Sequence, residues 1–278
     1  MTDRYAVVGH PVAHSKSPAI HAAFARETRQ DIRYDRLLAP LDGFKTTVNA
    51  FRDAGGRGLN VTLPFKQQAW QLAEHHGGSA LTAAAVNTLD FRDGLCTGHN
   101  TDGVGLVTDI RDNLHCPFAA RRVLMLGAGG ATYGVMESIL RERPLEVVIA
   151  NRTLAKASAL VAHFTGIASL AALGVRFVAY DELAGMQFDV VVNATSAGLD
   201  GGMPPLPRGV FAAGALAYDM LYGRQTAFMQ FAAAEGAAVS DGCGMLVEQA
   251  AASFEIWRGV RPSTAPVIDA LRAGRESA

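Results

Sequence analysis

The stretch "RRVLMLGAGGATYGVMESIL" (Arg121–Leu140) decides the fold class of this chain. Its apolar run leads into closely spaced glycines, and the residues that follow carry apolar side chains three and four positions apart, as in a helix. The next run, "PLEVVIANRT" (Pro144–Thr153), has the composition of a buried strand. A strand, a glycine turn, a helix and a second strand in this order predict a parallel β–α–β unit.

The same alternation extends along most of the chain. Segments such as "SPAIHAAFARE" (17–27) have helical spacing, and they separate strand-like runs that include "YAVVG" (5–9), "GLNVTLPF" (58–65), "DVVVNATSAG" (189–198) and "GALAYDMLY" (214–222). A chain of 278 residues exceeds the size at which a single hydrophobic core stops growing. We therefore expect an α/β protein of two domains.

Composition narrows the class of partner. The chain has 25 basic and 26 acidic residues without a basic run, which disfavours nucleic acid and membrane surfaces and favours a small molecule. Its three cysteines, Cys96, Cys116 and Cys243, are far apart, so neither a disulfide framework nor a metal site is expected. No signal pattern and no apolar run of membrane-spanning length is present. We expect a cytoplasmic monomer or homodimer.

The glycine turn is typical of a nucleotide site. Gly127 and Gly129 match the first two glycines of a dinucleotide fingerprint, which lets backbone N–H groups and a helix N-terminus approach a pyrophosphate. Thr132 stands where a third small residue is usual, so the match is incomplete. The strand–turn–helix–strand context nevertheless favours a nucleotide site over a bare structural turn.

The end of the second strand selects the cofactor. Domains that prefer NAD usually carry an acid there, which binds the ribose 2′-hydroxyl. This chain has "ANRT" (150–153), in which Arg152 can grip a 2′-phosphate, with further donors from Asn151, Thr153 and Lys156. The sequence therefore predicts NADP.

Candidate catalytic residues lie in the first hundred residues or so. Lys66 ends "NVTLPFK" (60–66), Asn87 lies in "AVNTL" (85–89), and Asp102 lies in "GHNTDG" (98–103). Hydride transfer between an alcohol and a ketone needs a partner for the hydroxyl proton, and a lysine with an aspartate can serve. Desolvation lowers the pKa of such a lysine while the carboxylate raises it, and the sequence leaves open which effect is larger.

Nine ordered blocks resemble the shikimate dehydrogenase family: "YAVVGHPVAHSKSP", "NVTLPFK", "AVNTL", "NTDG", "LGAGGA", "ANRT", "NATSAG", "YDMLY" and "DGCGMLVEQAA". The resemblance implies reversible NADPH-dependent reduction of 3-dehydroshikimate to shikimate, a step toward chorismate and the aromatic amino acids. It also implies an N-terminal α/β substrate domain at 1–103, completed by C-terminal helices at 242–278. A Rossmann-like NADP-binding domain is expected at 104–241.

The resemblance implies a role for each matching residue. Lys66 and Asp102 match the catalytic pair, and Ser15 and Ser17 match the residues that bind the substrate carboxylate. The other positions matching substrate-binding residues are Thr62, Asn87, Asp102, Tyr222 and Gln249. The positions matching the cofactor site are Gly127, Ala128, Gly129, Gly130, Ala131, Asn151, Arg152, Thr153, Lys156, Thr195, Ser196, Met220 and Gly242.

Two other functions remain open. One is a paralogue that acts on quinate or aminoshikimate; NAD users of this kind would carry an acid near Arg152. The other is a non-enzymatic NADP sensor, which would not need Lys66 and Asp102. Most of the histidines are expected in loops or at the surface with no part in catalysis: His10, His14, His21, His75, His76 and His99.

Overall fold

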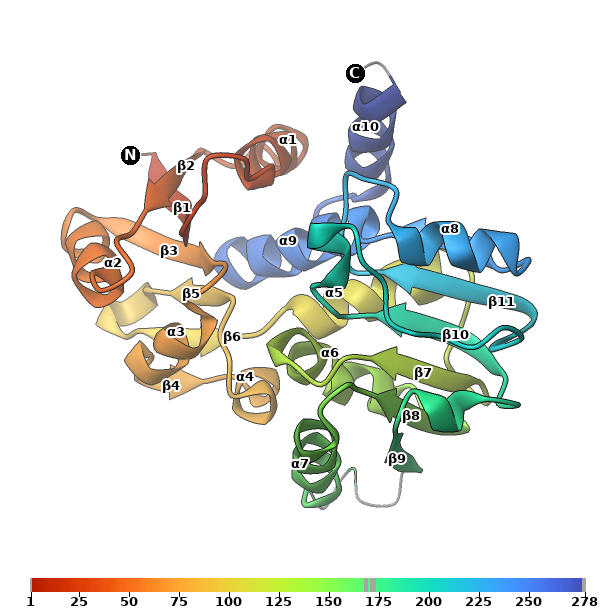
Figure 1. Cartoon of the computed structure of the whole chain (residues 1–278). Coiled ribbons are helices and arrows are strands. Elements are labelled where there is room, and N and C mark those ends of the chain that lie inside the picture. Colours follow the sequence, from red (N-terminus) through yellow and green to blue (C-terminus); the bar gives the residue numbers. More distant parts are fainter. Residues whose placement is uncertain (1, 168–169, 171–173, 277–278) are drawn as a thin grey trace. The chain divides into compact units, whose positions relative to one another are not determined.

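The computed structural model describes residues 2–167, 170 and 174–276. The chain forms two compact units, one made of Met1–Gly105 with Leu246–Ala278 and the other of Leu106–Met245. Within the described residues, each unit is built on its own six-stranded sheet (Figure 1). We refer to them as unit 1 and unit 2.

The sheet of unit 1 is mixed. Its strand order is β2-β1-β3-β5-β6-β4, with bounds β1 (Asp3–Gly9), β2 (Ile32–Leu38), β3 (Gly56–Val61), β4 (His75–His76), β5 (Thr88–Asp90) and β6 (Thr97–His99). Strands β1, β2 and β3 are parallel, whereas β5 runs antiparallel to both β3 and β6. The parallel pairing that the sequence pattern predicted holds for β1 and β3, whereas β5 was not predicted and adds the antiparallel segment.

Helices cover both faces of this sheet, which explains why β1 is buried without interruption from Tyr5 to Gly9. On one face Ala6 and Val8 pack with Phe44 and Phe65. On the other face Tyr5 stacks on Trp257, with ring centroids 4.7 Å apart. The helices of this unit are α1 (Ser17–Thr28), α2 (Phe44–Asp53), α3 (Lys66–Leu72), α4 (Gly78–Ala83), η1 (Arg92–Gly94), α5 (Asp102–Thr108), α9 (Cys243–Arg258) and α10 (Ala265–Glu276), of which α5 and α9 extend into unit 2.

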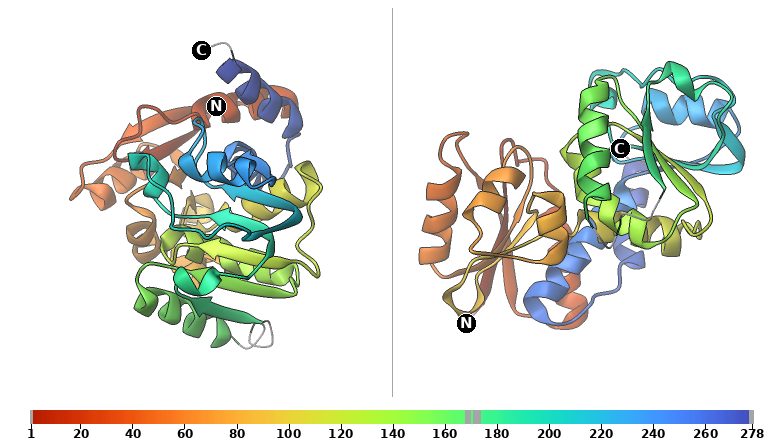
Figure 2. Two further views of the ribbon diagram at one scale, coloured as in Figure 1. Left: turned by 45° about the vertical axis from the view of Figure 1, so that its right-hand side comes forward. Right: turned by 90° about the horizontal axis from the view of Figure 1, so that it is seen from below.

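Unit 2 is a doubly wound parallel sheet in the order β12-β11-β10-β7-β8-β9, with helices on both faces (Figure 2). Val123 and Met125 face the core shared with α6 and α7, while Leu124 and Leu126 face the core that contains Phe228 of α8. The strands are β7 (Arg122–Leu126), β8 (Glu146–Ala150), β9 (Val175–Val178), β10 (Phe188–Asn193), β11 (Phe211–Asp219) and β12 (Ala238–Asp241). The helices are η2 (Asp109–Asn113), α6 (Gly130–Arg141), α7 (Leu154–Thr165), η3 (Asp181–Leu183), η4 (Ala197–Asp200) and α8 (Ala227–Ala234).

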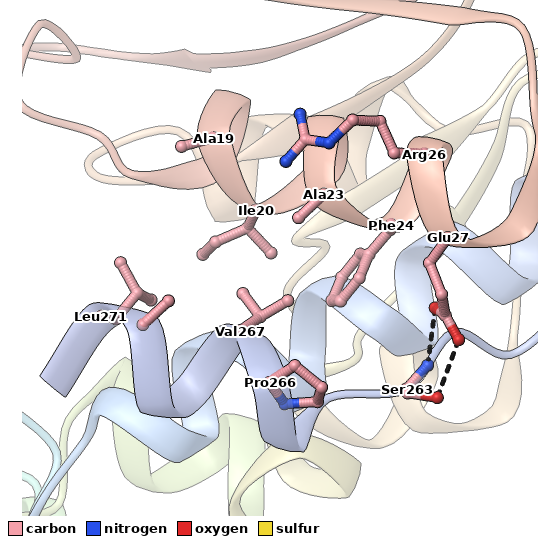
Figure 3. Close-up of a pocket in the computed structure, with 11 residues that line it drawn as sticks. Ala19, Ile20, Ala23, Phe24, Arg26, Glu27, Ser263, Pro266, Val267 and Leu271 are labelled. Carbon is pink, nitrogen blue, oxygen red and sulfur yellow. Dashed lines mark hydrogen bonds between the residues drawn. The ribbon is translucent and has the colours of Figure 1, made fainter. Parts of the chain in front are cut away.

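An apolar groove of about 450 Å³ lies between α1 and α10 of unit 1 (Figure 3). Ile20 and Phe24 of α1 face Val267 and Leu271 of α10 across it. It contains none of the site residues predicted above. In the part of the chain that the structure describes, no helix has the length and apolar character needed to cross a membrane.

His21 is the histidine whose predicted position is wrong. It lies on α1 with 0 % of its surface exposed, and its ring stacks on Tyr34 with centroids 4.1 Å apart. Neither ring nitrogen has a hydrogen-bond partner among the residues that the structure describes. Because burial penalises the charged imidazolium, the pKa of His21 falls to about 3.

This buried imidazole predicts an acid-sensitive fold. Between about pH 6.5 and pH 3 the unfolded chain holds a proton on His21 that the folded chain does not. The free energy of unfolding should therefore fall as the pH falls, by up to about 1.4 kcal/mol per pH unit from this residue. His21→Phe should remove this part of the slope in urea unfolding measured from neutral pH to about pH 4.5.

The exposed His75 supplies the matched control, since His75→Gln should keep the wild-type slope. The comparison concerns the pH dependence, so an absolute change in stability caused by the larger phenyl ring does not affect it. A His21→Phe variant with the same acid dependence as the wild type would contradict the assignment.

Candidate active site

Lys66 and Asp102 meet in unit 1 although 36 positions separate them in the chain. Lys66 is the first residue of α3 and Asp102 the first of α5, and the lysine Nζ donates to the carboxylate Oδ2 in a direct ion pair. Their side chains are 30 % and 13 % exposed. The pair is thus shielded from bulk water yet open to a ligand on one side.

Asn87 holds the other oxygen of the carboxylate. Its Oδ1 accepts hydrogen bonds from the backbone N–H of Thr101 and from Thr88 Oγ1, both at 2.9 Å. This orientation turns its amide nitrogen toward Asp102, to which it donates at 2.8 Å on Oδ1. Asp102 is therefore fixed on both oxygens, by an ammonium on one and an amide on the other.

Gln249 joins this cluster from α9. Its Oε1 lies 3.4 Å from the amide nitrogen of Asn87, which donates to it. The approach depends on Gly105 of α5, because a Cβ at that position would lie 2.7 Å from the Cβ of Gln249 and 2.8 Å from its backbone nitrogen. Only glycine lets the two helices pack so closely.

The two serines lie together in the loop that follows β1. Ser15 Oγ is 3.2 Å from Ser17 Oγ and accepts from the Ser17 backbone N–H at 3.3 Å. The loop after β3, which carries Thr62, is bonded to β1 and its loop: Thr62 N–H donates to Val8 O at 2.9 Å, and His10 N–H to Leu63 O at 3.0 Å. Both loops therefore leave the carboxyl edge of neighbouring parallel strands.

In unit 2 the chain turns sharply after β7. Gly127 has a φ of +102°, a conformation that favours glycine, and a Cβ there would lie 3.1 Å from Thr195 Cγ2. Thr132, the departure from the fingerprint, is fully buried and donates from Oγ1 to the carbonyl of Gly127 at 2.8 Å. A hydroxyl that ties the helix to its own turn explains why threonine is accepted at this position.

The turn leaves room at the N-terminus of α6. Within the described part of the chain, a Cβ on Gly129 or on Gly130 would meet no atom within 4 Å. Asn151, at the end of β8, accepts from the backbone N–H of Ala128 at 3.2 Å and so steadies the turn. Open space over glycines at the start of a twelve-residue helix, which continues through Ala131, fits a bound diphosphate.

Two exposed cations follow β8. Arg152 and Lys156 make no side-chain hydrogen bond or ion pair with any residue the structure describes. Next to Arg152, Asn151 Nδ2 donates to the carbonyl oxygen of Thr153 at 2.8 Å, which orders the turn into α7. Unpaired cations beside ordered donors fit a 2′-phosphate, so the residues present suit NADP.

The remaining cofactor candidates gather around Asn193 of β10. Thr195 Oγ1 donates to Asn193 Oδ1 at 2.7 Å, and Met220 N–H donates to Asn193 O at 3.0 Å. Ser196 follows Thr195 directly, and Gly242 N–H donates to Leu221 O at 3.0 Å, which brings Gly242 beside Met220. These residues lie at the carboxyl ends of β10, β11 and β12.

Tyr222 lies in unit 2, whereas Ser15 and Ser17 lie in unit 1. Its side chain is 37 % exposed, and partial burial raises the pKa of its hydroxyl above the usual value. The group is therefore a neutral hydrogen-bond donor at neutral pH.

Comparisons with known proteins identify the family of this chain. Family models match at residues 7–89 (shikimate dehydrogenase substrate binding domain), 110–199 (shikimate/quinate 5-dehydrogenase) and 242–272 (shikimate 5′-dehydrogenase C-terminal domain). A shikimate dehydrogenase (NADP(+)) of Methylobacillus flagellatus is 57% identical over 273 residues, which cover 98% of this chain and 99% of that protein. The chain belongs to the shikimate dehydrogenase family.

Solved structures of similar proteins share the fold over nearly their full length. An Ael1 enzyme from Pseudomonas putida has a TM-score of 0.91 and 46% identity, with 97% of this chain and 98% of that chain covered. A shikimate 5-dehydrogenase from Thermus thermophilus, in complex with NADP(H) and shikimate, has a TM-score of 0.86 and 34% identity, with coverage of 98% and 99%. The chain therefore shares the fold of the shikimate 5-dehydrogenase from Thermus thermophilus over 98% of its length.

Sequence reasoning missed the buried polar groups that lie behind the Lys66–Asp102 ion pair. Ser253 is fully buried, accepts from Asn60 Nδ2 at 2.9 Å and lies 2.7 Å from Thr88 Oγ1. Asn100 Oδ1 accepts from the backbone N–H of Asp102 at 3.0 Å. A signal existed for Ser253, because it follows Gln249 by four residues and so shares its helix face.

The open space at the glycine turn predicts the behaviour of Gly129→Ala. The added methyl group meets no protein atom, so the melting temperature should stay within about 2 °C of the wild type. It would fill the space assigned to the cofactor diphosphate, so the KM for NADP should rise about tenfold or more. Steady-state kinetics and thermal unfolding measure both.

Gly78→Ala is the matched control, since its Cβ also meets no atom within 4 Å and it lies on α4 of unit 1. That variant should keep the wild-type KM for NADP. An unchanged KM in Gly129→Ala would rule out the diphosphate at this turn.

Proposed function

We propose that this protein catalyses the reversible NADPH-dependent reduction of 3-dehydroshikimate to shikimate, a step toward chorismate and the aromatic amino acids. The observation that carries the proposal is the ion pair of Lys66 with Asp102, held from behind by Asn87. Membership in the shikimate dehydrogenase family supports the substrate, and the names of its relatives support NADP as cofactor.

The pair would manage the substrate proton. When NADPH is bound it supplies the hydride. During reduction the carbonyl oxygen gains a proton from the Lys66 ammonium, and in the reverse direction the amine takes the hydroxyl proton back. Asp102 keeps the amine in place and balances its charge, and the exposed part of Lys66 lets the amine regain its proton from water.

The substrate would be held by Asp102 and by neutral polar groups around the ion pair. The hydroxyls of Ser15 and Ser17 would donate to the carboxylate, and Tyr222 would close that end. The ring hydroxyls would be bound by Thr62, Asn87, Asp102 and Gln249. We assign residues 1–103 with 242–278 to the substrate domain and 104–241 to the NADP domain.

The cofactor would lie along the carboxyl edge of the sheet in unit 2. Gly127, Ala128, Gly129, Gly130 and Ala131 would bind the diphosphate. Asn151, Arg152, Thr153 and Lys156 would bind the 2′-phosphate, while Thr195, Ser196, Met220 and Gly242 would line the nicotinamide half. We expect the enzyme to work in the cytoplasm as a monomer or homodimer.

Quinate is the second candidate substrate, because one matching family model describes quinate as well as shikimate dehydrogenases. The unpaired charge of Arg152 favours NADP over NAD in either case. A non-enzymatic sensor would have no use for a buried network that orients Asp102, so the enzyme is the better account.

The test is an absorbance assay of nicotinamide reduction with purified protein, using shikimate or quinate combined with NADP or NAD. Shikimate with NADP should give the highest kcat/KM, about 100-fold or more above quinate with NAD. Equal or better turnover of quinate with NAD would replace the proposed function by the paralogue. No turnover of any combination would reject the enzyme altogether.

A further inference from the structure

The two serines of the carboxylate subsite carry no charge. Ser15 and Ser17 offer hydroxyls, and their contacts with each other orient these groups without supplying a cation. A carboxylate leaving water for this loop therefore gains hydrogen bonds but no charge complement from the serines themselves. The complement has to come from a neighbouring residue.

Arg36 contacts this loop directly. It lies on β2 opposite Val7 of β1, and its Nε and Nη2 donate to the carbonyl oxygen of Ser15 at 3.0 and 2.6 Å. One guanidinium group thus donates two hydrogen bonds to the loop, at the residue whose hydroxyl is proposed to bind the substrate. The contact also draws the carbonyl dipole of Ser15 toward a cation, which reduces its repulsion of an anion nearby.

The charge of Arg36 is not balanced by an acid. Among the residues that the structure describes, Arg36 makes no ion pair, and both of its hydrogen bonds go to a neutral carbonyl. The loop "GHPVAHSKS" (9–17) contains no acid and adds the exposed Lys16. Arg33, three positions earlier on the same strand, is by contrast paired with Asp35 at 2.8 Å.

We propose that Arg36 is a specificity-determining residue, which supplies the positive charge that makes the Ser15–Ser17 subsite select an anionic ring acid over its neutral ester. The inference rests on the proposed function for the identity of the ligand. Arg36 is a cation on β2 that contacts the subsite only through the carbonyl oxygen of Ser15. Because Arg36 is exposed, its effect on a nearby anion should be moderate and sensitive to salt.

A structural role would look different. If Arg36 only held the loop in shape, its loss would weaken every ligand that uses the two serines, whatever its charge. If it acts by charge, its loss should weaken the carboxylate and spare a methyl ester with the same ring. Arg36→Lys keeps the charge but loses the paired donors, so it should retain most of the discrimination.

The experiment is calorimetric titration of the full-length chain with shikimate and with methyl shikimate, at low and at raised ionic strength. Arg36→Gln should weaken shikimate binding about five- to tenfold and change binding of the ester less than about twofold. Raised salt should reduce the difference in shikimate affinity between this variant and the wild type. Arg33→Gln, the matched loss of a charge from the same strand, should leave both affinities unchanged.

Equal losses for the acid and the ester, or no loss for either, would overturn the inference, as would a wild type that binds no shikimate. The turnover assay separates this result from the proposed function. Charge-dependent binding of shikimate without its oxidation by NADP would uphold the role of Arg36 and reject the proposed reaction.

Discussion

The contact between the Lys66 ammonium and the Asp102 carboxylate is the interaction on which the proposed chemistry depends. Each group comes from the first residue of a different helix, so the pair exists only because the fold brings the beginnings of α3 and α5 together. A half-buried ion pair is stable only when its remaining hydrogen-bonding capacity is satisfied. Asn87 and the hydroxyls behind it meet that condition for Asp102.

Both units place their proposed site residues by the same geometric rule. Parallel strands end at a common edge, and the loops that leave this edge carry the serines, Thr62 and Lys66 in unit 1 and the glycine turn in unit 2. Glycine is required where a second chain segment comes close, as at Gly105 against Gln249 and at Gly127 beside Thr195. The polar groups are thereby held by rigid elements, which keeps them oriented before a ligand binds.

Periodicity along the chain was enough to predict the α/β class and the glycine turn, because these are local patterns of apolar and small residues. The ordered motifs pointed to Lys66 and Asp102, which the structure joins in an ion pair. Strands β5 and β6 were not predicted because each has three residues, too few to show the alternation of apolar and polar residues that marks a strand. Ser253 was not predicted because its contact with Thr88 spans 165 positions of the chain. Thr132 was interpreted as a mismatch because the sequence does not reveal its hydrogen bond to the carbonyl oxygen of Gly127.

The central claim is that Lys66 and Asp102 act as one unit, and a double-mutant cycle on turnover tests it most directly. Lys66→Ala should lower kcat about 10²- to 10⁴-fold, and Lys45→Ala, a change at an exposed lysine, should not. If the pair acts together, adding Asp102→Asn to Lys66→Ala should slow the enzyme by no more than about threefold further. The account would be contradicted if the fold-losses in kcat of the two single variants multiplied in the double variant. It would also be contradicted by a Lys66→Ala enzyme that keeps about a tenth of the wild-type kcat.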